Sequence, residues 1–352
     1  MRKDTSVLLE YGIDFNWLND SVAELGGYNL NFVYKRKRFH VNTANITTEK
    51  SKLLEGFGLQ VYGETIYFIE SNILFGEILD VPQNLRKSVQ IVLGCTSCEF
   101  ALSWCSETEL DLNGWDLSDA KTIAYTLSCS SQLRYLYFED WCVTSVENAT
   151  GVLSDCAALQ SVTFDSWDTS NFITMSLFFS GCLNLKNLDL NNWDVSNVLD
   201  MDSTFRNCKA LEQLEVDEWR PVNCLECLYT FAGCRSIQEL NLASWRLSKV
   251  ENLFGMFKGC ESLRALDLSG WCTQNVISVK EIFCGCKSLE VLDISGWCFD
   301  EIVNCEYSFT GCELLSRIDA FGCDDNVLNW LIECAPATCK IMTDNGIVAD
   351  GE

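Results

Sequence analysis

The sequence predicts an α/β solenoid, an array of stacked coils that share one parallel β-sheet. Tryptophan recurs every 26 residues, two apolar columns before each tryptophan alternate as a strand does, and an apolar pattern of helical spacing follows it. A fixed period of this length is typical of solenoids, in which each unit buries its apolar face only by stacking on the next. The tryptophans are Trp115, Trp141, Trp167, Trp193, Trp219, Trp245, Trp271 and Trp297.

Each repeat begins with a short strand that ends near the tryptophan. In residues 188–193, Leu188 and Leu190 alternate with Asp189 and Asn191 before Trp193. Alternation with a period of two predicts a strand with one buried and one outward face. Trp193 then marks the corner of the coil, where a large ring can stack on the rings above and below it.

A short helix is expected after each tryptophan and its polar turn. Met201, Phe205 and Cys208 stand at i, i+4 and i+7, which is the spacing of one helix face. A glycine such as Gly233 often precedes the cysteine, where it suits the left-handed conformation after a helix. The cysteines hold one column, and we interpret them as small buried core residues rather than a metal ladder: Cys156, Cys182, Cys208, Cys234, Cys260, Cys286 and Cys312.

The period divides the chain into three parts. Residues 107–320 hold about eight coils of the predicted leucine-rich solenoid. Residues 1–106 lack the period and contain alternating segments, so we expect a small β-rich or α+β amino-terminal module that anchors or caps the array. Residues 321–352 include "DDNVLNWLIECAPA" and "CKIMT", which predict a helix and a strand of a carboxyl-terminal cap and tail.

Several columns resemble a known repeat family. "FRNCKALEQLEV" and "FKGCESLRALDLSGW" contain the Cys-x-x-Leu-x-x-Leu-x-Leu core of leucine-rich repeats. Together with the Trp-Asp-x-Ser-Asn-Val turn and the Phe-x-Gly-Cys segment, the chain resembles the BspA-like leucine-rich repeat proteins of bacteria and some protists. This resemblance implies binding, commonly adhesion at a cell surface, and it implies no catalysis.

Charge and hydropathy restrict the partners and the location. The chain has 25 Lys+Arg against 50 Asp+Glu, a formal net charge of -25. Nucleic acid and anionic membranes are therefore poor ligands, whereas a basic protein is a plausible one. The sequence shows no secretory signal pattern and no transmembrane segment. We accordingly expect a cytoplasmic protein, or a component of a virion or other assembly reached by a non-classical route.

Residue types for catalysis or metal binding are scarce. His40 is the only histidine, so a Ser-His or Cys-His dyad has one place to form, and we predict that the protein is not an enzyme. We expect no cofactor. Cys95, Cys98 and Cys105 have a spacing that leaves zinc open. Cys272 and Cys298 follow successive tryptophans at a distance that permits a disulfide, and we expect them to be free thiols.

The outward face of the strands is the candidate binding surface. Acidic residues recur there at almost every coil, and one tyrosine offers an aromatic contact. Like charges on neighbouring strands destabilise a sheet, so the pattern indicates either a partner of opposite charge or simple solubility of an exposed face. The residues are Asp111, Tyr137, Glu139, Asp165, Asp189, Asn191, Glu215, Asp217, Asp267 and Asp293.

The sequence thus predicts a non-enzymatic protein that recognises a protein partner through its acidic sheet face, in adhesion or host interaction. A glycan is a less favoured ligand, and the amino-terminal module is expected to dock on a larger assembly. Two alternatives remain open. One is a structural or receptor-binding component of a cell-surface layer or virion, and the other is an acidic decoy that mimics nucleic acid and occupies a DNA-binding protein.

Overall fold

The computed structural model describes residues 97–113, 117–138 and 141–350, together with the backbone of six short strands nearer the amino terminus. These six strands pair antiparallel, in the orders β1-β2-β3 and β4-β6-β5. Their bounds are β1 (Phe15–Trp17), β2 (Val22–Leu25), β3 (Tyr28–Asn31), β4 (Lys37–His40), β5 (Leu59–Tyr62) and β6 (Thr65–Phe68). Trp115, Glu139 and Cys95 lie outside the described residues.

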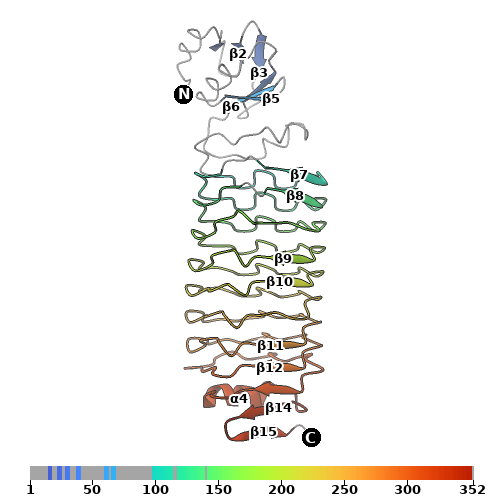
Figure 1. Ribbon diagram of the computed structural model, residues 1–352, viewed down its shortest axis with the longest axis vertical. Helices are drawn as coiled ribbons and strands as arrows, with labels where there is room; N and C mark the ends of the chain where they lie inside the picture. Colours follow the sequence, from blue (N-terminus) through green and yellow to red (C-terminus); the bar gives the residue numbers. More distant parts are fainter. Residues whose placement is uncertain are drawn as a thin grey trace.

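Residues 97–322 form a stack of parallel coils, and most of the coils place a short strand on the same side (Figure 1). The strands pair with a shift of one repeat, so that Leu188 lies beside Leu214 and Leu266 beside Leu292. The solenoid with one parallel sheet is therefore confirmed. Its strands are β7 (Glu109–Asp111), β8 (Tyr135–Tyr137), β9 (Asn187–Asp189), β10 (Gln213–Glu215), β11 (Ala265–Asp267), β12 (Val291–Asp293) and β13 (Arg317–Asp319).

Stacking begins before the predicted start at residue 107. Ser97 forms a parallel bridge with Thr122, and the Cys98 amide donates to the Thr122 carbonyl at 2.9 Å. Cys98 and Cys105 are buried in the core of this first coil. The segment escaped the sequence period because Ser97 pairs with a residue 25 positions later, one fewer than the 26 of the repeat.

The predicted helix in each coil is wrong: a row of tight turns stands in its place. Backbone amides there alternate between two kinds of acceptor. Ser203 and Phe205 donate to Leu228 and Thr230 of the next coil, at 2.8 and 2.9 Å. Arg206 instead donates to Ser203 three residues back, at 3.1 Å. The second side of the solenoid is therefore another parallel ladder, built from turns.

The straight shape of the array fits turns rather than helices on its second side. Paired strands repeat at about 4.8 Å, whereas a helix with its side chains is about 10 Å wide. Helices stacked in register with such strands would force the array to curve. Figure 1 shows an array that is straight from β7 to β13, which is the shape expected when both sides are hydrogen-bonded ladders.

The core consists of stacked columns of identical residues. Seven indole rings, from Trp141 to Trp297, stack with centroids 5.9–6.3 Å apart and planes within 16° of parallel. A parallel column of phenylalanines runs from Phe179 to Phe309 at 5.5–5.7 Å. The tryptophan prediction holds for these seven rings, all of which are buried.

The cysteine column from Cys156 to Cys312 is buried, and it also forms hydrogen bonds. Each thiol lies 3.1–3.2 Å from a backbone carbonyl of the preceding coil, as Cys208 does from Phe179. Burial raises the pKa of these thiols, to about 12 for Cys208. A protonated thiol is thus a small core side chain that also donates to the neighbouring coil.

The carboxyl-terminal cap contains α4 (Asp325–Cys334), β14 (Lys340–Thr343) and β15 (Gly346–Asp350). Asp324 caps α4 by accepting from the Val327 amide at 2.9 Å. Trp330 on α4 continues the indole column, 6.1 Å from Trp297. β14 adds to β13 in parallel, and β15 then pairs antiparallel with β14. Among the described residues, no helix combines the length and apolarity that crossing a membrane requires.

Candidate functional site

The sheet face is the outward surface of the strand segments, and its side chains follow from the strand pattern. In β8, β9, β10 and β11 the middle residue is buried and the two flanking residues are exposed. Neighbouring coils stack in register, so each outward position becomes a column that runs along the array. A residue type repeated in one column therefore forms a continuous stripe on the surface.

A groove of about 800 Å³ lies on this face between β10 and β13. Seven of its fifteen lining residues are carboxylates, and none of these fifteen described residues is a lysine or arginine. We call this feature the acidic groove. Its carboxylates are Glu212, Glu215, Asp217, Glu239, Asp267, Asp293 and Asp319.

Four of the predicted binding residues come together in the acidic groove: Glu215, Asp217, Asp267 and Asp293. Five others occupy the sheet face nearer the amino terminus and do not line the groove: Asp111, Tyr137, Asp165, Asp189 and Asn191. Tyr137 is 40% exposed, so its ring is accessible as an aromatic contact would require. Glu139 lies outside the described residues.

Sequence reasoning missed three carboxylates of the groove: Glu212, Glu239 and Asp319. Glu239 stands six residues before Trp245. This position is also outward, and it comes just before the first inward residue of the strand segment. Asp319 belongs to the degenerate ninth coil, four residues before Cys323, and extending the strand columns by one unit would have found it. Glu212 immediately precedes β10, and the period carried no signal for it.

Several sheet-face aspartates also have a local structural role. One carboxylate oxygen of Asp189, Asp267 and Asp293 accepts from the backbone amide two residues later, at 3.1, 3.0 and 2.9 Å. Such Asx turns end a strand and favour aspartate or asparagine whatever the ligand. The recurrence of aspartate in this column therefore does not by itself demonstrate binding. Glu215, which occupies the same column, is too long for this turn.

The carboxyl-terminal end of the groove is partly neutralised. The Arg317 guanidinium donates to Asp319 at 2.8 Å, and Asp319 is 9% exposed. At the opposite end of the groove, the Lys186 ammonium lies 3.9 Å from the Glu212 carboxylate. The other carboxylates of the groove give it a negative field that would attract a cationic group.

No group of three or more histidine, cysteine, aspartate or glutamate side chains among the described residues is arranged to hold a metal ion. Cys224 and Cys227 are fully buried core residues. Hydrogen bonding to Cys224 and burial raise the pKa of Cys227 well above its usual value, so it is not a nucleophile near neutral pH.

Leucine-rich repeat proteins are among the solved structures that match this chain. One from Bacteroides ovatus is 17% identical, has a TM-score of 0.32 and matches over 94% of this chain and 98% of its own. A leucine-rich cell surface protein from Faecalibacterium prausnitzii is 15% identical, with a TM-score of 0.31 and coverage of 95% and 97%. A chain from a complex of Latrophilin 3, Unc5D and FLRT2 is 15% identical, with a TM-score of 0.33 and coverage of 66% and 74%.

A family model matches residues 96–219 and 225–322, which together form most of the coil array. The family is described as "Mycoplasma protein of unknown function, DUF285". The matched range starts one residue before the first described coil and ends just before the cap helix. A comparison of the sequence with curated proteins found no match.

Proposed function

The chain belongs to the DUF285 family, and we propose that it is a non-enzymatic binding protein whose acidic groove recognises a basic surface of a partner protein. One observation carries the proposal: seven carboxylates line a single groove without a lysine or arginine among its lining residues. The stacked strands fix the backbone positions from which these carboxylates project. We also infer kinship with the BspA-like leucine-rich repeat proteins, and a role in adhesion or host interaction.

A protein fits the groove better than a glycan. The groove extends across successive coils from β10 to β13, and a glycan site of that length would need aromatic platforms for the sugar rings. Its lining residues contain no aromatic side chain. Lysine and arginine side chains, in contrast, pair directly with carboxylates and benefit from the negative field during approach.

The test removes charge from the groove while it preserves the fold. In the triple variant Glu215→Gln, Asp217→Asn and Asp267→Asn, each substitution keeps the shape of the side chain, and the carboxamide introduced at position 267 can still accept from the Ser269 amide. We expect affinity for a partner captured from the native host to fall by about tenfold to 100-fold. Isothermal titration with the purified partner measures the change.

A matched control removes three charges elsewhere. Glu251→Gln, Glu301→Gln and Glu313→Gln change exposed carboxylates that do not line the groove, so the net charge shifts equally. This control variant should bind as the wild type does, and binding of the wild type should weaken as salt increases. Equal losses of affinity in the two triple variants would show that only the net charge matters. Unchanged affinity in both would place the binding site elsewhere.

A further inference from the structure

The cap helix α4 is fixed to the last coils at two points. At the first, Trp330 stacks on Trp297, with ring planes 9° from parallel, and on Phe309 at 5.2 Å. The Trp330 indole also donates to the Ser308 hydroxyl at 3.1 Å. At the second point, one turn further along α4, Cys334 faces Cys305.

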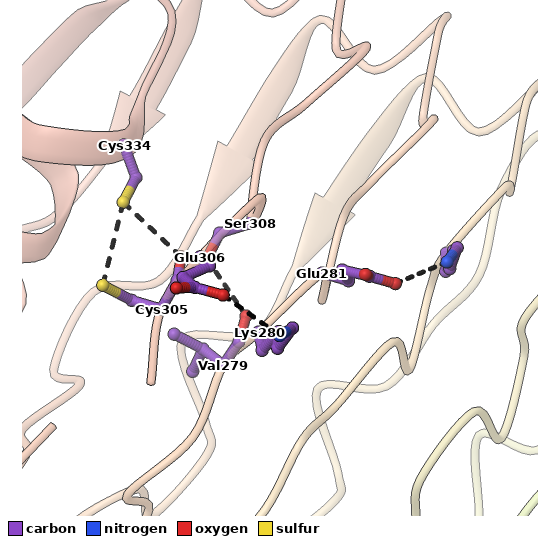
Figure 2. A network of polar contacts seen from close by, with 8 residues as sticks. Val279, Lys280, Glu281, Cys305, Glu306, Ser308 and Cys334 are labelled. Carbon is purple, nitrogen blue, oxygen red and sulfur yellow. Dashed lines mark hydrogen bonds and ion pairs between the residues drawn. The ribbon is translucent and has the colours of Figure 1, made fainter. Parts of the chain in front are cut away.

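The two sulfur atoms of this pair are 3.9 Å apart (Figure 2). The Cys334 thiol is also 3.5 Å from the Cys305 carbonyl oxygen. That carbonyl lies 2.5 Å from the Ser308 hydroxyl, which shares its one hydrogen with the Val279 carbonyl at 3.0 Å. The backbone beside Cys305 is thus held by Ser308, and the helix that carries Cys334 is held to the same Ser308 through Trp330.

This pair differs from the cysteine column of the core. Each column thiol is buried and bonded to a carbonyl of the preceding coil. Cys305 and Cys334 are only partly buried, and they face each other. A disulfide needs a sulfur separation of about 2.0 Å, so the two sulfurs must approach by about 1.9 Å. Rotation about the side-chain bonds of two partly exposed cysteines can supply such a movement.

We propose that Cys305 and Cys334 form a reversible disulfide that locks the carboxyl-terminal cap onto the solenoid. The oxidant is a low-molecular-weight disulfide. The Cys305 thiolate attacks one of its sulfurs, the S–S bond of the reagent breaks, and one thiolate leaves. Cys334 then attacks the Cys305 sulfur of the mixed disulfide, and the second thiolate leaves. The two protons of the cysteines pass to the two leaving groups, so the protein loses two electrons and the reagent becomes two thiols.

The order of attack follows from the surroundings of the two sulfurs. Burial and the adjacent Cys305 raise the pKa of the Cys334 thiol to about 12. Cys334 therefore keeps its proton near neutral pH, with its sulfur 3.9 Å from the Cys305 sulfur and 3.5 Å from the Cys305 carbonyl oxygen. Cys305 is consequently the sulfur that meets the reagent first, and Cys334 resolves the mixed disulfide.

The disulfide would close a loop across 29 residues that includes the last coil, β13 and most of α4. Because β14 and β15 follow α4, the same bond would restrain the strands that cover the end of the sheet. An oxidised protein should therefore hold its cap more firmly than a reduced one. This inference is independent of the acidic groove, since neither cysteine lines it.

The experiment uses the full-length reduced protein and a series of mixtures of reduced and oxidised glutathione. Remaining thiols are alkylated, and cross-linked peptides are identified by mass spectrometry. We expect the Cys305–Cys334 cross-link to form at a lower share of oxidised glutathione than any other intrachain link. The melting temperature of the oxidised protein should exceed that of the reduced protein by roughly 5 °C.

Three variants complete the test. Cys305→Ser and Cys334→Ala should each abolish the cross-link and the temperature shift, whereas Cys142→Ser, an exposed cysteine in a distant coil, should retain both. If either variant folds poorly, the cross-linked peptides of the wild-type protein still test the proposal. A glutathione adduct that persists on Cys305, a link that forms first between Cys272 and Cys298, or a cross-link without a temperature shift would each overturn the proposal.

Discussion

At the scale of single residues, the indole rings share one stacked position but differ in the partner of the indole N–H. Trp219 donates to the Leu190 carbonyl at 2.8 Å. The corresponding carbonyl for Trp193 is that of Phe164, which instead accepts from the Asn192 side chain at 3.0 Å. The Trp193 nitrogen is buried without a hydrogen-bond partner. Two residues that look equivalent in the sequence therefore contribute differently to stability.

This difference predicts unequal responses to one substitution. Trp219→Phe removes ring area and a buried hydrogen bond, whereas Trp193→Phe removes ring area and a nitrogen that lacks a partner. We expect Trp219→Phe to lower the free energy of unfolding by about 1 kcal/mol more than Trp193→Phe. Trp193→Ala should cost about 3 to 5 kcal/mol through loss of the ring.

Urea denaturation of the three variants, followed by circular dichroism, measures these differences. The wild type and Trp193→Phe serve as the references for Trp219→Phe. Equal losses for the two phenylalanine variants would show that the indole N–H of Trp219 adds nothing to stability.

At the scale of elements, the row of turns depends on residues with positive φ. Gly255 and Gly259 have φ of 60° and 72°, and both occupy columns that are left-handed in several coils. Asn207, Asp155 and Tyr229 adopt the same conformation in neighbouring coils without being glycine. The turn row is therefore imposed by the stack, and glycine only lowers its local cost.

Two glycine substitutions separate backbone strain from crowding. A Cβ on Gly259 meets its nearest atom at 3.8 Å, so Gly259→Ala should cost about 1 kcal/mol from the left-handed backbone alone. A Cβ on Gly255 would fall 2.6 Å from the Tyr229 ring, which lies between Phe254 and Arg206. We expect Gly255→Ala to cost about 1 to 2 kcal/mol more than Gly259→Ala.

Thermal and chemical unfolding of the two alanine variants measures both costs. The double variant Gly255→Ala, Tyr229→Ala removes the crowding and leaves the strained backbone. Gly255→Ala should lower the free energy of unfolding more in the wild type than in the Tyr229→Ala background. Equal losses in the two backgrounds would show that crowding does not contribute.

At the scale of the whole molecule, the stack joins many like charges. The formal net charge is -25, and cross-coil ion pairs such as Lys121–Glu147 and Lys287–Glu261 offset only part of it. Among the described residues, Asp202 is the carboxylate whose pKa is raised most. Burial, with Asp200 and Glu226 nearby, raises its pKa to about 6 from the usual 3.8, although its oxygen accepts from the Leu228 amide.

This raised pKa predicts a pH-dependent loss of stability. The folded protein holds the Asp202 proton more tightly than the unfolded chain, so the contribution of Asp202 to stability is greatest below about pH 4, falls as pH rises to about 6, and stays lower above it. Asp202→Asn keeps an acceptor for Leu228 and removes the titration. We expect the variant to be more stable than the wild type by about 1 kcal/mol at pH 7, since the carboxyl is only partly shielded from water.

Urea unfolding at pH 4 and pH 7 tests this prediction, because the difference between variant and wild type should shrink at the lower pH. Asp194→Asn, an exposed aspartate on a turn, is the control for loss of one negative charge. A gain that is equal at both pH values, or equal in the control, would contradict the role of Asp202.

The sequence by itself determined the period, the approximate number of coils, the strand columns and the buried tryptophan and cysteine columns. These features follow because the same residue type recurs every 26 positions. Stacking in register then places the recurring residues in one column. It also indicated the acidic outward face, although part of that pattern arises from Asx turns such as that of Asp189.

Only the tertiary structure decided the second side of the coil and the place of the groove. Met201, Phe205 and Cys208 have helical spacing, but the backbone there bonds to the next coil, which keeps the array straight where helices wider than the strand spacing of about 4.8 Å would make it curve. Likewise, the stacking of the coils brings Glu239 and Asp319 to the acidic groove. The docking of the cap brings Cys334 to Cys305. Contacts between coils and the cap depend on distance in space, and the period of a sequence records only distance along the chain.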